Sequence, residues 1–177
     1  FVNGTGVSTG QIDSRAGSQV TFSSDNFVLD QGATITGPAQ TRLLSGTTYI
    51  GDSAADVVPA TNFLVAGGTL TGPGTMNVSG GFTLTAGTVS GSGDLNFLAA
   101  SENTFNGASS TIDARPVNNH FASTLNVGVD LLTLRGGTVI DNDGTINVQG
   151  NTVVNGSDNG GSTIQNNNLL KKTVAGT

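Results

Sequence analysis

The chain has 177 residues, enough for one domain of ordinary size, with 27 glycines, 5% aromatic residues and no cysteine. Its formal net charge is −6 and its six basic residues are scattered, which argues against nucleic acid or an anionic membrane surface as partner. The lack of cysteine excludes disulfides and thiolate metal sites, and no apolar run is long enough to span a bilayer. Good helix formers never hold a helical period over three turns, so we expect strands and turns almost exclusively.

The first part of the chain, residues 1–26, matches the repeat described below less well than the rest. We interpret it as an irregular first coil of a single domain that spans residues 1–177. Residues 1–4 have neither the basic segment nor the apolar core of a signal peptide. Both ends of the chain carry repeat-like sequence, so we interpret the whole as a fragment of a longer repeat protein.

An irregular segment follows at Gly46–Ala66, which contains the only tyrosine, Tyr49, and the acids Asp52 and Asp56. We interpret this segment as a coil with an insertion at one corner, although two short coils fit its length about as well. A rigid scaffold can hold variable corner segments out for recognition. Tyr49, Asp52 and Asp56 are therefore the first candidates for a binding site.

The clearest pattern lies in Gly67–Phe97, because residues 69–78 align without a gap on residues 88–97. Each copy alternates polar and apolar residues around a glycine-containing corner, and alternation with a period of two places every second side chain on one face of a sheet. A unit this short cannot bury its apolar face alone and must stack on another copy. We therefore predict a β-solenoid in which Leu70 and Val89 share one apolar column.

The same pattern, extended along the chain, provides one apolar anchor in each pass. The anchors are Ile12, Ile35, Leu70, Val89, Ile112, Val139 and Ile164. By subtraction they are 23, 35, 19, 23, 27 and 25 positions apart, close to the coil length of repeat architectures except at the second gap. The sequence thus predicts an all-β, right-handed parallel β-helix of about seven coils, with the handedness taken from the general bias of parallel crossovers.

A second irregular segment, Asp113–Ala122, contains Arg115, a proline and the only histidine, His120. The proline removes a backbone donor, so we expect a corner or loop here. Asp113 and Arg115 can share one face, and together with His120 and Asp130 they constitute the enzyme hypothesis, in which carboxylates and cations act on an acidic polysaccharide. Because nothing in the sequence makes these groups converge, we expect no enzyme and no catalytic residue, and keep Arg115 and His120 as binding candidates.

Two further motifs resemble parts of known binding sites, but neither is complete. The run Asp141–Gly144 resembles the centre of a calcium loop, but Val139 and Gly150 stand where carboxylates are needed, so we expect a plain turn, no metal site and no cofactor. Three Thr-x-Thr units resemble parts of an ice-binding face, yet the array does not continue over half of the chain. The units are Thr34–Thr36, Thr69–Thr71 and Thr83–Thr85.

Three segments of the chain resemble a known class of repeats. GGTLTGPGTMNV (67–78), FTLTAGTVSGSGDLNF (82–97) and STIQNNNLLKKTVAGT (162–177) resemble the β-helical passenger and stalk regions of large bacterial surface proteins, the filamentous-haemagglutinin-like and autotransporter-like adhesins. The resemblance covers most of residues 27–177. It implies a right-handed parallel β-helix, export, and a role as a spacer or an adhesive surface.

The expected function is therefore that of a structural or adhesive rod segment in a secreted bacterial surface protein, located outside the cell or on its surface. Its expected partners are adjacent repeats of the same protein and a host-surface or polysaccharide ligand bound at the corner loops. The alternative is a polysaccharide-active enzyme or carbohydrate-binding module on the same fold. Lys171 and Lys172 are expected on an outer face of the next coil, with protection of an open edge as the alternative.

Overall fold

The computed structural model describes residues 2–128, 131–150, 152–156 and 161–173, and the statements below concern these residues. Within them the chain forms strands and turns, and no helix is present that is long and apolar enough to cross a membrane. The strands join into one sheet of 18 strands whose neighbours pair in parallel, in stacked coils. The chain is a β-solenoid of about seven turns, as the sequence predicts.

Each coil has three sides, which we name A, B and C in the order in which the chain visits them after β1. Side A consists of β2 (Gln11–Asp13), β4 (Thr34–Thr36), the first parts of β6 (Val57–Val65) and β8 (Thr75–Ser90), β9 (Leu95–Phe97), β11 (Val117–Asn119), β14 (Val139–Asn142) and β17 (Thr163–Asn166). Side B consists of the first parts of β3 (Val20–Leu29), β5 (Thr41–Ile50) and β10 (Glu102–Asp113), the last part of β6, the middle part of β8, β12 (Thr124–Val127), β15 (Thr145–Gln149) and β18 (Leu169–Thr173). Side C consists of β1 (Gly6–Ser8), β7 (Thr69–Thr71), β13 (Leu131–Arg135), β16 (Val153–Gly156) and the last parts of β3, β5, β8 and β10.

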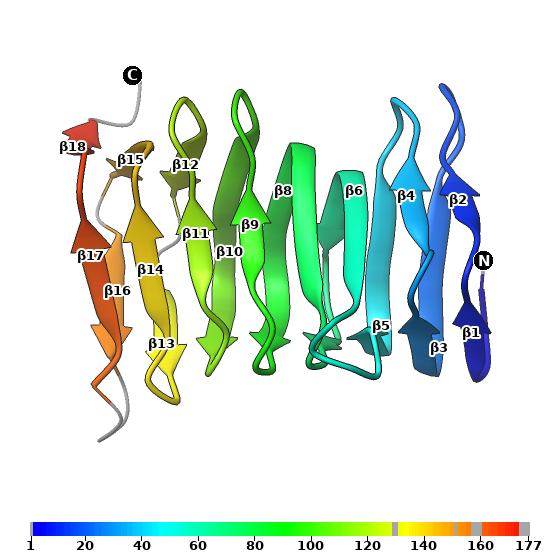
Figure 1. Cartoon of the computed structure of the whole chain (residues 1–177). Coiled ribbons are helices and arrows are strands. Elements are labelled where there is room, and N and C mark those ends of the chain that lie inside the picture. The colour runs from blue at the N-terminus through cyan, green and yellow to red at the C-terminus, as the bar shows by residue number, and fades with distance from the viewer. Residues whose placement is uncertain (1, 129–130, 151, 157–160, 174–177) are drawn as a thin grey trace.

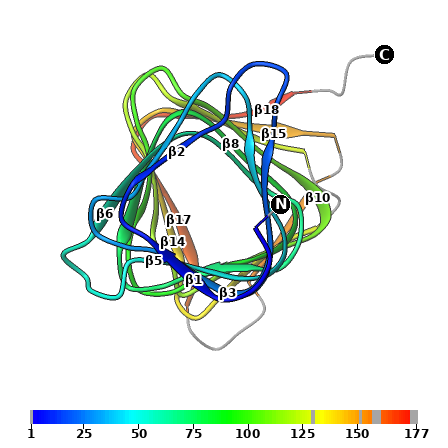
Figure 2. The same ribbon diagram turned by 90° about the vertical axis from the view of Figure 1, so that its right-hand side faces the viewer.

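The coils stack into a rod with the N-terminus at one end and the last strands at the other (Figure 1). The strands of side A, such as β4, β9, β11 and β14, lie next to each other along this rod and all point the same way (Figure 1). Seen from the N-terminal end, the chain passes from β1 to β2 to β3 clockwise as it recedes (Figure 2). The coil is therefore right-handed.

Apolar columns inside the coil run along the rod. On side C, Leu70 pairs with Val89 and Val89 with Ile112, and all three side chains are fully buried. The prediction of a shared Leu70–Val89 column is confirmed. Four phenylalanines extend the core, with Phe82 placed 6.2 Å from Phe63, 5.7 Å from Phe97 and 6.4 Å from Phe105 between ring centroids. Each buried side chain of this size contributes about 1.5–3 kcal/mol, which makes the core the main source of stability.

The seven predicted anchors do not form a single column. Ile12 and Ile35 pair with each other on side A, whereas Leu70 and its partners lie on side C. The last match is wrong by one residue, because Ile140 and not Val139 pairs with Ile164. The reason is that all three sides carry the same alternating pattern, so an anchor can be assigned to the wrong side, and a slip of one position exchanges inner and outer residues.

The long second gap is explained by the change of side. Ile35 pairs with Ala60, 25 positions further on, and the remaining 10 positions to Leu70 carry the chain from side A to side C of the same coil. Within Gly46–Ala66, the loop between β5 and β6 (residues 51–56) is the corner insertion. The interpretation of one coil with an insertion is confirmed, and the interpretation of two short coils is wrong.

Candidate functional site

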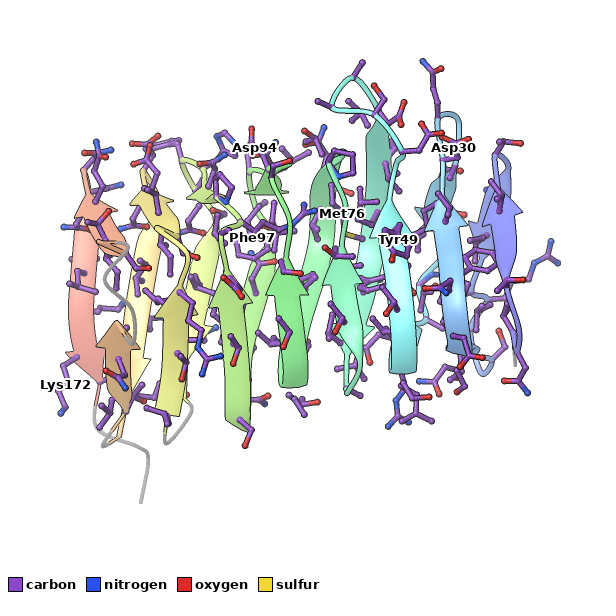
Figure 3. The ribbon with its side chains drawn as sticks, turned by 90° about the horizontal axis from the view of Figure 1, so that it is seen from below. Asp30, Tyr49, Met76, Asp94, Phe97 and Lys172 are labelled. Carbon is purple, nitrogen blue, oxygen red and sulfur yellow. The ribbon has the colours of Figure 1, made fainter. Side chains whose placement is uncertain are left out.

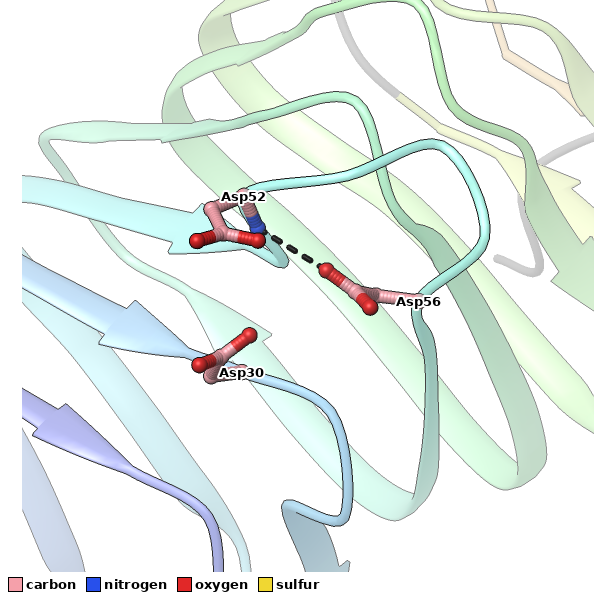
Figure 4. Close-up of side chains that lie close together, drawn as sticks. All are labelled: Asp30, Asp52 and Asp56. Carbon is pink, nitrogen blue, oxygen red and sulfur yellow. Dashed lines mark hydrogen bonds between the residues drawn. The ribbon is translucent and has the colours of Figure 1, made fainter.

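The first candidate site is a group of three aspartates at the corner between sides C and A, which we call the acidic corner. Asp30 follows β3, Asp52 follows β5 and Asp56 precedes β6, so two neighbouring coils supply the three side chains (Figure 4). One carboxylate oxygen from each lies within 4.8 Å of the others. Asp52 is exposed, Asp30 is half-buried and Asp56 is only 4% exposed. The structure therefore brings the predicted residues Asp52 and Asp56 together and adds Asp30.

Asp56 is held in place by the loop that it closes. Its Oδ2 accepts the backbone N–H of Asp52 at 3.0 Å (Figure 4). It also accepts the backbone N–H of Ser53 at 2.9 Å. The loop can pass this close because Gly51 has a φ of +65° and a Cβ at that position would lie 2.6 Å from the Cβ of Asp56. The Gly-Asp-Ser-x-x-Asp sequence thus builds a compact turn whose carboxylate satisfies two otherwise free donors.

The chemistry open to the acidic corner follows from its ligand set. Three carboxylates from two coils are the type of oxygen ligands that calcium or magnesium prefers. Without a cation, like charges at this separation repel each other. However, the hydrogen bonds of Asp56 already account for its burial. We therefore describe the acidic corner as a capped loop with an exposed negative charge and assign no metal to it.

Tyr49 lies beside this corner but outside the insertion. It belongs to β5 on side C, where it pairs with Val28 of the preceding coil and Thr71 of the following coil. Its ring lies on the outer surface and is 36% exposed (Figure 3). The flat side of the rod, and not the corner loop, presents the aromatic side chain.

Arg115 is not a surface residue. It is fully buried, and its guanidinium donates hydrogen bonds to four backbone carbonyls. The Nε–H donates to Ser90 at 2.6 Å, one terminal nitrogen to Gly72 at 2.7 Å, and the other to Gly74 and Asp94 at 3.3 Å each. These carbonyls belong to the same corner, between sides C and A, in the two preceding coils. Arg115 therefore joins three consecutive coils and does not face solvent, as a surface binding role would require.

The burial of Arg115 has an electrostatic consequence. Removal from water lowers the pKa of Arg115 to about 10, and the nearby charge of Asp94 acts in the opposite direction. The guanidinium therefore remains charged at neutral pH. Its charge is balanced mainly by carbonyl dipoles at a corner rich in glycine, which explains why the arginine can be placed inside the rod.

The other members of the enzyme hypothesis are not brought together. Asp113 ends β10 and is half-buried, whereas His120 lies exposed at the next corner, beyond the whole of β11. Asp130 lies outside the described residues. Since Arg115 points inward, the described part of the chain does not assemble the cation and carboxylates of the hypothesis around one outer position.

A feature that the sequence reading did not identify is the apolar tip at the corner between sides A and B. Phe121 is 75% exposed and directly follows the exposed His120. Ala122 has a φ of 64°, and its carbonyl accepts the N–H of Ala100 from the preceding coil at 3.2 Å, so the tip is held by the stack. The only signal in the sequence is an aromatic residue that breaks the alternation just after a strand.

Rows of polar side chains cover the flat sides. On side A, Asn96 donates to Asn77 and Asn118 donates to Asn96, at 2.8 and 2.7 Å. Side C carries a row of five paired threonines, which are Thr47, Thr69, Thr88, Thr111 and Thr133. The three predicted Thr-x-Thr units lie on three different sides and do not form one face, because they belong to β4, β7 and the inner part of β8.

The run Asp141–Gly144 contains the last two residues of β14 and the bend at Asp143 and Gly144 that follows it. Asn142 points inward and is fully buried, whereas Asp141 lies on the outer side. Asp141 and Asp143 both accept hydrogen bonds from the side-chain amide of Asn167 in the following coil, at 2.7 and 3.1 Å. These side chains connect two coils and do not converge on one point in the manner of a calcium loop.

The fold and its side-chain rows define this chain as a β-solenoid repeat protein. No protein-family model matches the chain, and neither a curated protein nor a solved structure is significantly similar to it.

Proposed function

We propose that this chain is a structural rod segment of a secreted bacterial surface protein, which presents its corners for adhesion. The observation that carries the proposal is that the inner columns run along the whole rod and stay open at the C-terminal end. There Val154, Ile164 and Leu170 occupy inward positions but are 37%, 37% and 48% exposed. An open apolar cross-section favours a rod that continues into a further coil. The setting at a bacterial surface rests on the resemblance of the repeats alone.

Of the two lysines expected on an outer face, only Lys171 has an outer position. Lys171 pairs with Asn147 in an outer row. Lys172 pairs with Val148 in an inward position, near the end of β18, and projects beyond the ribbon at the C-terminal end of the rod (Figure 3). A charge in an inward position can also protect an edge strand. At the rim of the cross-section, however, its stem can cover apolar surface while the ammonium group stays in water.

Two corners are suited to recognition. The tip formed by His120 and Phe121 offers an aromatic surface, and the acidic corner offers the exposed Asp52. Both corners are hydrogen-bonded to neighbouring coils, the tip through the Ala122 carbonyl and the acidic corner through the Gly51 N–H and the Asp56 carbonyl. Host-surface molecules and polysaccharides are the proposed ligands of these corners. The enzyme alternative has no comparable support, because Arg115 is used inside the rod.

A bead assay tests the adhesive part of the proposal. Beads coated with the chain should adhere to host-cell layers or to immobilised polysaccharides, and the double variant His120→Ser and Phe121→Ser should adhere much less. The matched control is Thr88→Ser and Thr111→Ser on flat side C, which should adhere like the unchanged chain. Adhesion that depends on the threonine row and not on the tip would contradict the proposed role of the corners.

The structural part is tested by insertion of a short Gly/Ser peptide. An insertion between Phe121 and Ala122 should leave the melting temperature within a few degrees, since loops at corners lengthen at little cost. The same peptide inserted between Val117 and Asn118 should disrupt β11 and its pairing with β9 and β14. Circular dichroism during heating distinguishes the two cases. Equal losses at both positions would show that the corners are not independent of the rod.

A further inference from the structure

A row of asparagines lies inside the C-terminal part of the rod. On side A, Asn119 pairs with Asn142, and Asn142 pairs with Asn166. The Nδ2 of Asn119 donates to the Oδ1 of Asn142 at 2.7 Å, and the Nδ2 of Asn142 donates to the Oδ1 of Asn166 at 2.6 Å. Asn119 and Asn142 are fully buried, so their amide groups need partners inside the protein, and the Oδ1 of Asn119 accepts from the Ser123 hydroxyl at 2.6 Å.

The row has a direction. Each buried amide donates a second hydrogen bond to the carbonyl that opens the side B strand of the following coil, from Asn119 to Thr145 at 3.1 Å and from Asn142 to Leu169 at 3.2 Å. Both acceptors of each amide thus lie one coil nearer the C-terminus. Each of the two buried asparagines thus takes an Oδ1 and a carbonyl from the following coil.

Asn166 is the last described member of the row, and its surroundings differ. Its Nδ2 donates to the carbonyl of Asn168 at 3.1 Å, within its own coil, and its side chain is exposed. Beside it, Ile164 and Leu170 continue the columns of Ile140 and Ile146 and are partly exposed as well. At this edge the Asn166 amide and the apolar side chains of Ile164 and Leu170 are therefore not covered by a following coil.

We propose that the C-terminal edge binds a further parallel β-coil that carries an inward asparagine opposite Asn166 and apolar residues opposite Ile164 and Leu170. This inference rests on the proposed rod function and specifies the chemistry of the next coil. The asparagine supplies the Oδ1 acceptor that Asn119 and Asn142 each find one coil further on. A buried amide without an acceptor is costly, so the row selects coils that continue it.

A second copy of this chain, stacked through its N-terminal end, does not meet this requirement. Ile12 is the residue of the first coil that corresponds to Asn166. The column of paired residues begins at Ile12, passes through Ile35, Ala60, Val78 and Phe97 to Asn119, and ends with Asn142 and Asn166. Ile12 offers no acceptor. On side C, Gly6 of the first coil corresponds to Gly156 of the last, so two glycines would face each other and leave the core unfilled.

The test uses two extended variants of the chain. In the first, one coil with the sequence of residues 129–149 follows Thr173, in the register in which β13, β14 and β15 already stack on β16, β17 and β18. In the second, the added coil carries Asn142→Ile. Hydrogen exchange of the β17 and β18 amides is compared with that of the unextended chain. We expect the first variant to slow this exchange by about tenfold or more, and the second to protect about fivefold less, the effect of a lost buried hydrogen bond.

The outcomes separate the inference from the proposed function. If both added coils protect the edge equally, the rod continues but the selection by asparagine is overturned. If neither protects it, the continuing rod of the proposed function fails as well. Head-to-tail assembly of the unextended chain, measured by sedimentation at increasing concentration, would show that its own N-terminal coil fits the edge and would overturn the inference. Protection by the asparagine coil alone supports it.

Discussion

The middle of the rod and its C-terminal third fill the same inner position with opposite chemistry. On side A, one column contains Ala60, Val78 and Phe97 in the middle coils and continues as Asn119 and Asn142. The coils also lengthen. Val58 and Met76 are 18 positions apart and Met76 and Leu95 are 19 apart, whereas Val117 and Ile140 are 23 apart and Ile140 and Ile164 are 24 apart, by subtraction of paired positions.

This difference shows that one backbone register can be stabilised in two ways. Apolar packing in the middle is strong and non-directional, so it tolerates many side chains of the right volume. The asparagine row contributes less per residue, but each amide accepts only a partner at one position, so it specifies register and direction. The middle coils supply most of the stability, and the C-terminal coils specify what stacks on them.

The largest loss of stability is expected in the middle. Phe82→Ala should lower the free energy of unfolding by about 3–5 kcal/mol, because Phe82 is fully buried among three other phenylalanine rings. The matched control is Phe121→Ala at the exposed tip, with an expected change of about 0.5 kcal/mol or less. Urea unfolding followed by circular dichroism measures both. Similar losses for the two phenylalanines would contradict the assignment of the core to the middle coils.

A loss of about 3 kcal/mol or more is expected for Arg115→Met, which lies near the border of the two regions. The variant removes the guanidinium donor from four carbonyls at the C–A corner, of which that of Asp94 also accepts the Met76 N–H. Arg15→Met is the control, because the Arg15 side chain is 85% exposed in a surface ion pair worth at most about 1 kcal/mol. Thermal unfolding compares the two variants, and equal changes would show that Arg115 does not join the coils.

The pH dependence of this effect has a definite sign. Burial lowers the pKa of Arg115 to about 10, so above that pH the unfolded chain binds more protons than the folded chain until the ordinary arginine pKa is reached. The contribution of Arg115 therefore makes stability rise with pH in that alkaline window. Below about pH 9 both states keep the proton, and the difference between the native chain and Arg115→Met should be constant.

A smaller loss, of about 2 kcal/mol, is expected for Asn142→Leu in the C-terminal third. The change removes one of the two acceptors of the Asn119 Nδ2 and the donor to the Oδ1 of Asn166. Asn118→Leu is the control on the outer surface of the neighbouring strand β11. The partner left behind, the half-buried amide of Asn96, can bind water instead, so we expect a loss of about 1 kcal/mol or less in the free energy of unfolding. Hydrogen exchange of the β14 and β17 amides measures the difference locally. A larger effect at Asn118 would contradict the importance of the inner row.

The smallest expected effect is a gain. Thr48 is fully buried in the inner column between Phe27 and Leu70, and its Oγ1 has no hydrogen-bond partner. Thr48→Val should raise the free energy of unfolding by about 1 kcal/mol, because a valine of the same shape needs no partner. Thr41→Val should instead lower it by about 1 kcal/mol, since the buried Thr41 shares a 2.7 Å hydrogen bond with Ser14. Melting temperatures that move in the same direction would contradict this distinction.

The alternation of polar and apolar residues determines the coil itself. From it follow the parallel strands, the Leu70–Val89 column and the corner insertion near Asp52, because a period of two and a gapless internal repeat are properties of the chain that any stacked structure must respect. The same alternation does not distinguish the three sides, which is why the anchors Ile12 and Val139 are placed in a column to which they do not belong.

Only the tertiary structure decides which polar residues turn inward. Arg115 receives its partners from residues 21 to 43 positions earlier, and Asn142 from coils 23 and 24 positions away, so no local pattern identifies them as internal. The sequence around Arg115 is equally suited to an exposed corner. The stack brings together the carbonyls and amides that make burial of these groups favourable, and this proximity exists only once the coils have formed.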